Sequence, residues 1–275
     1  MTQSTNIKEL HWYIINEHHR IDRRNNIKRQ MDYIGIDKNH YHFFKAVGKT
    51  DNRVKKDYRY SVDNNKTSFI NKIGTIGLIH STIDLFKKIN ETTTDNYVVI
   101  LEDDAFFHRN FMSKVNTINF NKNANFIFLA YIMLNNQSVN KYYNLPHNLI
   151  DIKNHNDMFY GTYAFICDRN YRNKVIEKGA SWFIHNNLPV DDAINVLNKT
   201  DDMATFIIGG EQLVTHNVYD ENCLNPNLNY NTFYTDKRID IKRYYRFTED
   251  ACGYKKRDMF SLMPVKRPLA SLFNL

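Results

Sequence analysis

The sequence contains few of the residues that cross-link small extracellular domains. Its 275 residues include only three cysteines, Cys167, Cys223 and Cys252, and no two of them have a Cys-x-x-Cys spacing. An odd number of distant cysteines argues against both a disulfide framework and a thiolate metal site. We therefore expect the protein to work in a reducing compartment.

Long apolar segments are absent too. No uninterrupted apolar run of the sequence approaches the roughly 20 residues that a membrane-spanning helix needs. The first residues, MTQSTNIKELHWYIIN, lack the cationic start and apolar core of a secretory signal. We expect no membrane span and a cytoplasmic protein. The abundance of Asn, Ile and Lys suggests an AT-rich genome, consistent with a microbe or a large virus.

Linker-like tracts are also missing. The nine glycines and five prolines do not gather into a Pro/Gly-rich stretch, and the chain has no internal repeat. A chain of this length can bury roughly three quarters of its surface on folding. We expect a single domain over residues 1–275, with a basic C-terminal extension from about residue 237 to residue 275.

Positive charge is plentiful, with a formal net charge of +7. Nucleic acid, a membrane surface or a polyanionic small ligand would each suit this charge. Basic residues cluster at 18–29, 53–59 and 237–267, and the last cluster contains the aromatic-rich sequence RYYRF. These runs are also typical of a solvated surface. They leave open a basic nucleic-acid-binding protein without catalytic activity, although nucleic acid does not explain the acidic motifs described below.

The hydrophobic pattern alternates between strands and helices. Helices are predicted over residues 20–35, where Ile21, Ile27, Met31 and Ile34 have helical spacing, and over residues 73–89. A polar loop rich in Lys and Asn is expected between them, after a strand at 42–48. The other predicted strands are 12–15, 97–101, 125–133 and 160–167. This order indicates an α/β sandwich with a mainly parallel central sheet flanked by helices.

Three consecutive acids, Glu102, Asp103 and Asp104, follow the apolar strand in YVVILEDDAFF. Adjacent carboxylates repel one another, and burial beside an apolar strand adds a desolvation cost. Ligands of open α/β sheets bind where parallel strands end. Since side chains alternate, Glu102 and Asp104 share one side and suit Mg²⁺ or Mn²⁺, which could bridge to a diphosphate. The alternative is a solvated strand end or a helix cap.

Several ordered motifs make the sequence resemble glycosyltransferase family 25, which contains lipopolysaccharide and procollagen galactosyltransferases. IINEHHRIDRR is similar to the family's first strand and turn, and FKAVG to its F.AVDG segment with one residue missing. GTIGLIHS resembles GEIGC..SH, with Thr75 in place of Glu and Thr82 in place of His. ILEDD matches the family's metal motif. YGTYAFI, LPVDDAI and LVTHN resemble segments of the procollagen branch.

The resemblance implies a GT-A fold, a UDP-sugar donor, Mn²⁺ or Mg²⁺, and transfer with inversion to a hydroxyl of a protein or glycan. The transferred hexose would be galactose or glucose. Association of two copies into a homodimer stays open. The residues that the resemblance assigns to nucleotide-sugar binding are Asn16, Arg20, Arg23, Val47, Gly74, Gly77, Ser81 and Asp103.

Inverting transfer needs a base near the acceptor oxygen, on the side opposite the leaving diphosphate. Asp191 in LPVDD is the first choice for this base and Asp192 the second, although the same residues would also start a helix. His216 is a candidate third metal ligand, and a surface or core histidine is the alternative. Arg20 and Arg23 could hold phosphate or uracil, or lie on a helix surface.

Overall fold

The computed structural model describes residues 6–66, 70, 72–107, 111–116, 118, 120, 123–133, 142, 145–153, 159–210 and 213–216. The basic C-terminal extension, Cys223 and Cys252 lie outside these residues. Cys167 is a free thiol in the core.

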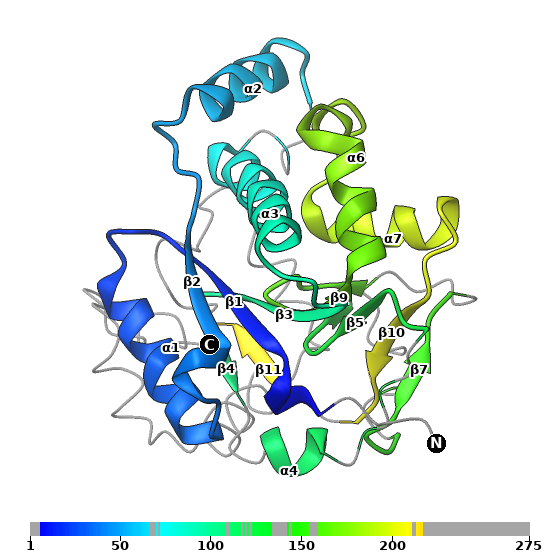
Figure 1. The fold of residues 1–275 in the computed structure, drawn as a ribbon. Coiled ribbons are helices and arrows are strands. Elements are labelled where there is room, and N and C mark those ends of the chain that lie inside the picture. Colours follow the sequence, from blue (N-terminus) through cyan, green and yellow to red (C-terminus); the bar gives the residue numbers. More distant parts are fainter. Residues whose placement is uncertain are drawn as a thin grey trace, which may run out of the picture.

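A seven-stranded sheet in the order β2-β1-β3-β9-β5-β10-β7 forms the centre of the molecule (Figure 1). Five strands run in one direction, and β7 and β9 run in the other. The strands are β1 His11–Asn16, β2 Tyr41–Lys45, β3 Tyr97–Glu102, β5 Phe126–Phe128, β7 Leu149–Asp151, β9 Ala164–Asp168 and β10 Thr205–Ile208. The predicted fold class is confirmed, and the architecture is consistent with a GT-A-like fold.

Two small antiparallel pairs accompany this sheet. Strand β4 (Ala105–Phe107) pairs with β11 (Val214–His216). Strand β6 (Ile132–Met133) pairs with β8 (Phe159–Tyr160). Both pairs therefore join segments that are distant in the sequence.

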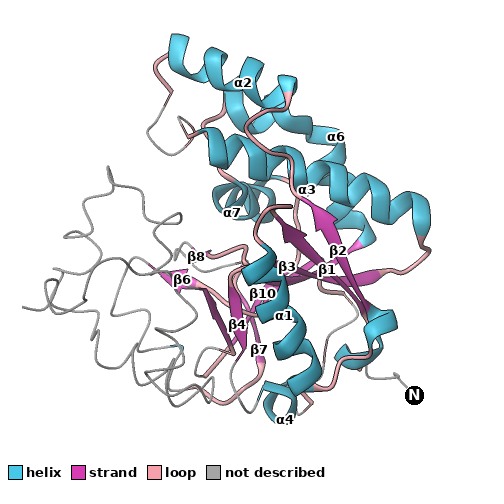
Figure 2. Cartoon of the chain, turned by 90° about the vertical axis from the view of Figure 1, so that its left-hand side faces the viewer, coloured by secondary structure: helices cyan, strands magenta, loops and turns pink. Residues whose placement is uncertain are grey.

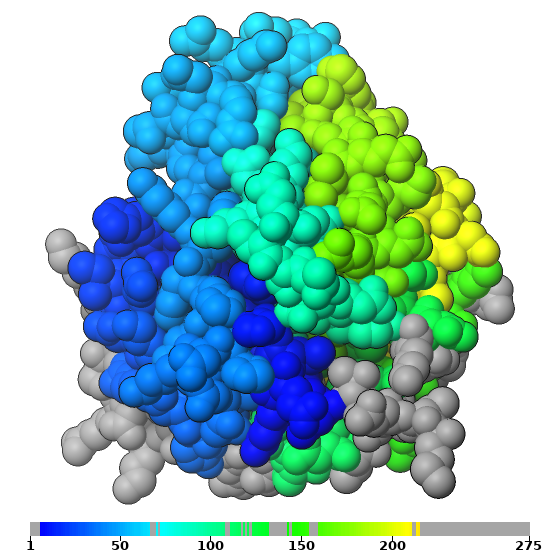
Figure 3. Space-filling model, viewed as in Figure 1, coloured from blue at the N-terminus to red at the C-terminus, as the bar shows by residue number. Residues whose placement is uncertain are grey.

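Helices cover both faces of the central sheet (Figures 1 and 2). Helices α2, α3, α6 and α7 contribute to one apolar core, and α1 and α4 contribute to the other. Figure 3 shows α2, α3 and α6 packed together on one face. The helices are α1 Ile21–Ile34, α2 Asn52–Asp63, α3 Ile73–Thr92, α4 Phe111–Val115, α6 Arg169–His185 and α7 Val190–Thr200, and 3-10 turns occupy Ile7–Glu9 and Lys38–His40.

The alternation along β3 connects its sequence to these two layers. Val98 and Ile100 enter the core under α3, α6 and α7, and Val99 and Leu101 enter the core beside α1. Continued alternation places Glu102 on the α7 side of the sheet and the next residue on the α1 side. Glu102 and Asp103 thus face different layers.

Both predicted amphipathic helices are confirmed. The first ends at Ile34 and is capped by Gly35, which has a left-handed backbone with φ 73°. Ile21, however, is 64% exposed rather than part of the apolar stripe. The loop expected before α3 contains α2, which was missed because it buries only Val54 and Ser61. Its start is capped by Asp51, whose carboxylate accepts a hydrogen bond from the Arg53 amide.

Three predicted strands have different bounds in the structure. The strand at 42–48 ends at Lys45, and the segment 125–133 forms two strands, β5 and β6. The segment 160–167 is divided between β8 and β9 by a turn at residues 161–163. Gly161 has φ 109° there, a conformation that side-chain-bearing residues rarely adopt and that ends an extended strand.

Candidate functional site

The site lies where β1 and β3 end next to each other. Ile15 of β1 pairs with Glu102, the last residue of β3, so Asn16 and the acidic turn meet at one edge of the sheet. Asp103 and Asp104 are 5% and 7% exposed. Burial of adjacent carboxylates requires compensating partners, because a charge removed from water must be paired or hydrogen-bonded.

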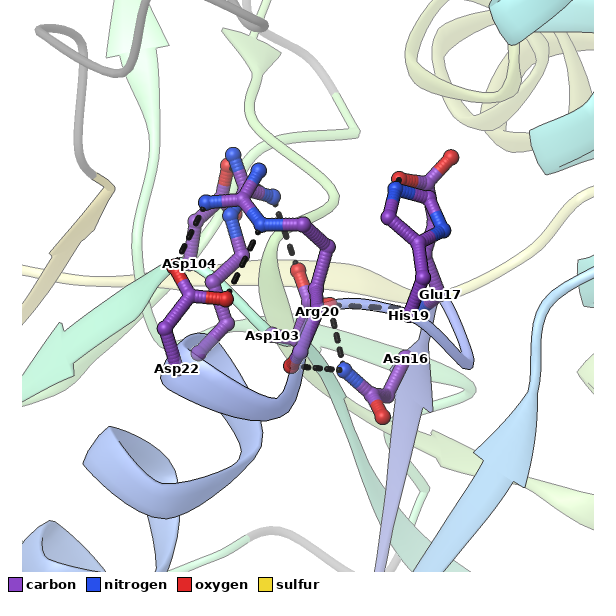
Figure 4. A network of polar contacts seen from close by, with 8 residues as sticks. Asn16, Glu17, His19, Arg20, Asp22, Asp103 and Asp104 are labelled. Atoms are coloured by element: carbon purple, nitrogen blue, oxygen red, sulfur yellow. Dashed lines mark hydrogen bonds and ion pairs between the residues drawn. The ribbon is translucent and has the colours of Figure 1, made fainter. Parts of the chain in front are cut away.

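Asp103 receives its partners from the end of β1, from the loop that follows and from the first turn of α1 (Figure 4). Its carboxylate accepts hydrogen bonds from Asn16 Nδ2 at 2.7 Å, from the Glu17 amide at 3.3 Å and from Arg23 Nη1 at 2.8 Å. Burial raises the pKa of Asp103, and Arg23 opposes that rise. Asp103 therefore ties the β1–α1 loop to the end of β3.

The two predicted arginines have different surroundings. Arg20 forms an ion pair at 2.9 Å with Asp22, whose side chain is 50% exposed. Arg23 contacts two buried acids, Asp103 at 2.8 Å and Asp104 Oδ2 at 3.4 Å. Arg23 consequently neutralises part of the acidic turn. The Arg20 side chain is as little exposed as that of Arg23, but it pairs with a half-exposed carboxylate, that of Asp22 (Figure 4).

Glu102 connects the acidic turn to the acidic start of α7. Burial raises the pKa of Glu102 well above its ordinary value, and the negative charges of Asp104, Asp191 and Asp103 raise it further, while Arg23 opposes them. The contribution of Asp191 indicates that the two acidic motifs, far apart in the sequence, lie near each other in the fold. A carboxylate in these surroundings would gain from a nearby cation.

Asp191 binds the turn between β8 and β9. Its carboxylate accepts hydrogen bonds at 3.2 Å from the amides of Gly161 and Thr162, and a third from the Thr162 hydroxyl. Beyond this turn, the Tyr163 carbonyl accepts a hydrogen bond from the Glu102 amide at 2.9 Å. The start of α7 is thus linked through the turn to Glu102.

Asp192 lies beside Tyr160 and is only partly buried. Burial raises the pKa of Asp192, and the neighbouring charge of Asp191 raises it further. Burial also raises the pKa of Tyr160, with further contributions from Asp192 and Asp191. Pro189 is the N-cap of α7, so neither aspartate is the cap residue.

The segment after β2 rests on the first turns of α3. The Val47 amide donates a hydrogen bond to the Ser81 hydroxyl at 2.7 Å, and this hydroxyl donates to the Gly77 carbonyl at 2.7 Å. A Cβ atom on Gly77 would lie 2.8 Å from the Val47 carbonyl oxygen, whereas one on Gly74 would meet nothing within 4 Å. Gly77 therefore allows the Val47 backbone to approach α3, and Ser81 holds it there through a hydrogen bond. The space around Gly74 is open.

The donor set suits a hard divalent cation. In the part of the chain that the structure describes, no group of three or more His, Cys, Asp and Glu side chains is arranged to hold a metal. Mg²⁺ sites, however, often use one or two carboxylates and complete their coordination with water and substrate phosphate. Glu102 and Asp104 fit that pattern. The backbone of His216 pairs with Ala105, which follows Asp104.

The sequence pattern did not single out two buried polar residues, Asn195 of α7 and Gln30 of α1, whose side chains hydrogen-bond to the backbone next to the site. Asn195 of α7 bonds both backbone groups of Phe159, accepting from its amide at 3.2 Å and donating to its carbonyl at 2.8 Å. Gln30 of α1 likewise donates to the Ala105 carbonyl at 2.9 Å and accepts from the Phe107 amide at 2.8 Å. A polar residue among the apolar positions of an amphipathic helix was the available signal.

The sequence model of glycosyltransferase family 25, described as an LPS biosynthesis protein, matches residues 9–194. The matched segment extends from the residues before β1 into α7 and includes both acidic motifs. A comparison with curated proteins finds no significant match. Among the described residues, no helix has both the length and the hydropathy needed to cross a membrane.

Proposed function

Because this chain belongs to glycosyltransferase family 25, we propose that it transfers a hexose from a UDP-sugar to a hydroxyl of a protein or glycan, with inversion. The family makes it a glycosyltransferase, with a sugar donor and an acceptor. Galactose or glucose is the proposed hexose. The observation that carries the proposal is the convergence of the acidic triplet at the end of β3 with the acidic start of α7: Asp191 accepts hydrogen bonds from Gly161 and Thr162, and Tyr163 of the same turn accepts one from the Glu102 amide.

The donor would bind at the acidic turn after β3. Glu102 and Asp104 would hold Mn²⁺ or Mg²⁺, with His216 as a further ligand. The ion would supply positive charge against the diphosphate. The surrounding residues proposed for nucleotide-sugar binding are Asn16, Arg20, Arg23, Val47, Gly74, Gly77, Ser81 and Asp103. Of these, Asp103 and Ser81 would act by holding neighbouring backbone, because their side chains bind Glu17 and Val47 respectively.

The acceptor would bind on the α7 side. One aspartate of Asp191 and Asp192 takes the proton of the acceptor hydroxyl. The acceptor oxygen then forms a bond to the anomeric carbon as the bond from that carbon to the diphosphate oxygen breaks, and its electron pair leaves with UDP. Membership in an enzyme family favours this reading over a noncatalytic nucleic-acid-binding protein.

Calorimetry of UDP binding tests the donor site. We expect measurable affinity with Mn²⁺ that is lost in chelator, and we expect Asp104→Asn to abolish the Mn²⁺-dependent part. Asp63→Asn, on the exposed end of α2, is the matched control and should bind as wild type. Equal UDP affinity with and without Mn²⁺ would contradict the metal-bridged donor site. If UDP binding depends on Mn²⁺, a screen of nucleotide sugars with and without Mn²⁺ would identify the donor.

A further inference from the structure

The two aspartates at the start of α7 have different tasks in the fold. Asp191 Oδ1 accepts hydrogen bonds from the amide and the hydroxyl of Thr162, and Asp191 Oδ2 accepts one from the Gly161 amide. Asp192 accepts no hydrogen bond and forms no ion pair with any residue that the structure describes. Adjacent residues of the same chemistry are thus used in different ways.

Helix α7 holds the segment before this turn with a second side chain. Asn195, one helical turn after Asp191, bonds the amide and the carbonyl of Phe159. Its Nδ2 also donates to the Asp191 carbonyl at 3.2 Å. Asp191 and Asn195 share one face of α7, because residues four apart in a helix lie one above the other. Together they fix the backbone from Phe159 to Thr162.

The held turn has little freedom of its own. Gly161 has φ 109°, and a Cβ atom there would lie 2.7 Å from the Tyr163 ring. On the far side of the turn, Tyr163 accepts the hydrogen bond of the Glu102 amide, and Leu101 pairs with Ala164. A displacement of the turn would therefore be transmitted directly to Glu102 at the end of β3.

We propose that Asp191 is a positioning residue, which fixes the turn at residues 161–163 and through it Glu102, and that Asp192 is the general base. This inference rests on the proposed transferase function. The three hydrogen bonds from the turn occupy the oxygens of Asp191, which leaves them poorly placed to receive a hydrogen bond from an acceptor hydroxyl. Asp192 keeps its oxygens available and lies beside Tyr160. The acceptor proton would move to Asp192 as the acceptor oxygen bonds the anomeric carbon and UDP departs.

The electrostatics of Asp192 support this assignment. Burial and the charge of Asp191 raise the pKa of Asp192, and a raised pKa makes a carboxylate a stronger base. Transfer should decline as pH falls through the raised pKa of Asp192, since the protonated carboxyl group cannot accept a proton.

Three variants separate the two roles, with transfer kinetics over pH and amide hydrogen exchange as the measurements. Asp192→Asn should lower kcat by roughly 10²–10⁴-fold and remove the acidic limb of the pH profile. Its donor KM and the exchange of the Gly161 and Thr162 amides should stay near wild type. Asp63→Asn, at an exposed position, is the control for an Asp-to-Asn change.

Asp191→Asn should act differently, because the amide group of Asn retains only one acceptor oxygen. The Gly161 and Thr162 amides should exchange faster, and activity should fall about 10–100-fold, as for losses of supporting contacts. The acidic limb should remain. Thr162→Val keeps both backbone hydrogen bonds and should change the same quantities less, so it serves if Asp191→Asn does not fold.

The outcomes distinguish this inference from the proposed function. Loss of the acidic limb in Asp191→Asn, with unchanged exchange at Gly161 and Thr162, would make Asp191 the base and overturn the assignment. Absence of transfer by the wild-type protein with every nucleotide sugar would remove the proposed function and the role of Asp192 with it. Amide exchange would still decide the positioning role, because unchanged protection in Asp191→Asn would contradict it without any assay of activity.

Discussion

Arg23 Nη1 lies 2.8 Å from Asp103 Oδ1, although 80 residues separate them in the chain. The same nitrogen lies 3.4 Å from Asp104 Oδ2. A single guanidinium group from α1 thus offsets two buried carboxylates of the acidic turn. This contact lets a carboxylate triplet fold against an apolar strand, because the repulsion within the triplet is partly compensated.

Replacement of Arg23 should therefore affect stability. In Arg23→Ala the buried Asp103 loses a charged hydrogen-bond donor, and the free energy of unfolding should fall by about 1.5–3 kcal/mol. Thermal and denaturant unfolding measure this change. An unchanged unfolding free energy would show that the ion pair is not needed to hold the acidic turn.

Arg20 provides the matched comparison. The Arg20 side chain is 11% exposed, but its ion-pair partner Asp22 is half-exposed, so loss of this ion pair in Arg20→Ala should cost less than about 1 kcal/mol of stability. If Arg20 contacts the nucleotide, the donor KM should rise while the melting temperature changes little. An unaltered donor KM in Arg20→Ala would return this residue to a surface role.

Two glycines of α3 give opposite predictions. Gly77→Ala places a Cβ atom 2.8 Å from the Val47 carbonyl oxygen, and overpacking of this kind costs about 1–3 kcal/mol. It should also displace the Val47 segment and weaken UDP binding. Gly74→Ala meets nothing within 4 Å and should stabilise the helix by about 0.4–1 kcal/mol. Unfolding curves and UDP calorimetry measure both; equal behaviour of the two variants would contradict the predicted Val47 contact.

A histidine cluster lies where β1 and β2 begin, at the end of these strands away from the candidate site. It predicts that the stability of the protein depends on pH. His11 Nδ1 and His42 Nε2 are 2.9 Å apart, the His40 ring stacks on His11, and Asp95 lies 3.8 Å from His11 Nε2. His42 is exposed on an edge strand. The neighbouring groups that exclude water from one side of its ring nevertheless lower its pKa, and the charges of His11, His40 and Lys88 lower it further. The folded state therefore binds a proton less readily than the unfolded chain does.

The contribution of His42 to stability is then present above its ordinary pKa of 6.5 and is lost as pH falls through the lower folded value. The melting temperature should fall between about pH 7.5 and about pH 5.5. His42→Gln should show a smaller fall, whereas His18→Gln, on the exposed loop after β1, should follow wild type. Equal pH dependence of His42→Gln and wild type would exclude this role of His42.

Elements with a strong local pattern could be predicted without the fold. Helix α3 carries apolar residues at helical spacing, and Ile79, Ile83, Phe86 and Ile89 are all buried as expected. Helix α2 could not be predicted, because it buries little and its polar residues resemble a loop. The pattern predicts a strand through residues 161–163 because the neighbouring residues are apolar, and hydrophobic periodicity carries no information on the left-handed conformation of Gly161.

The candidate site also has features that the sequence predicts and features that only the fold decides. The position of Glu102, Asp103 and Asp104 after an apolar strand follows from residue order, because side-chain alternation and the polarity of a strand are local properties. Their partners do not follow from order. Asn16 and Arg23 reach Asp103, and Asp191 reaches the Gly161 turn, only after β1, β3 and β9 pair in one sheet.

Residue order is therefore enough to select the candidate carboxylates. At that level Asp191 ranks before Asp192 as the candidate base, but residue order cannot test this ranking, since two adjacent aspartates at a helix start have equal chemistry. Their surroundings separate them: helical geometry turns Asp191 toward Gly161 and Thr162, and Asp192 toward Tyr160. Successive helical positions point in directions about 100° apart, so which of the two carboxylates receives hydrogen bonds is decided by the elements packed against α7.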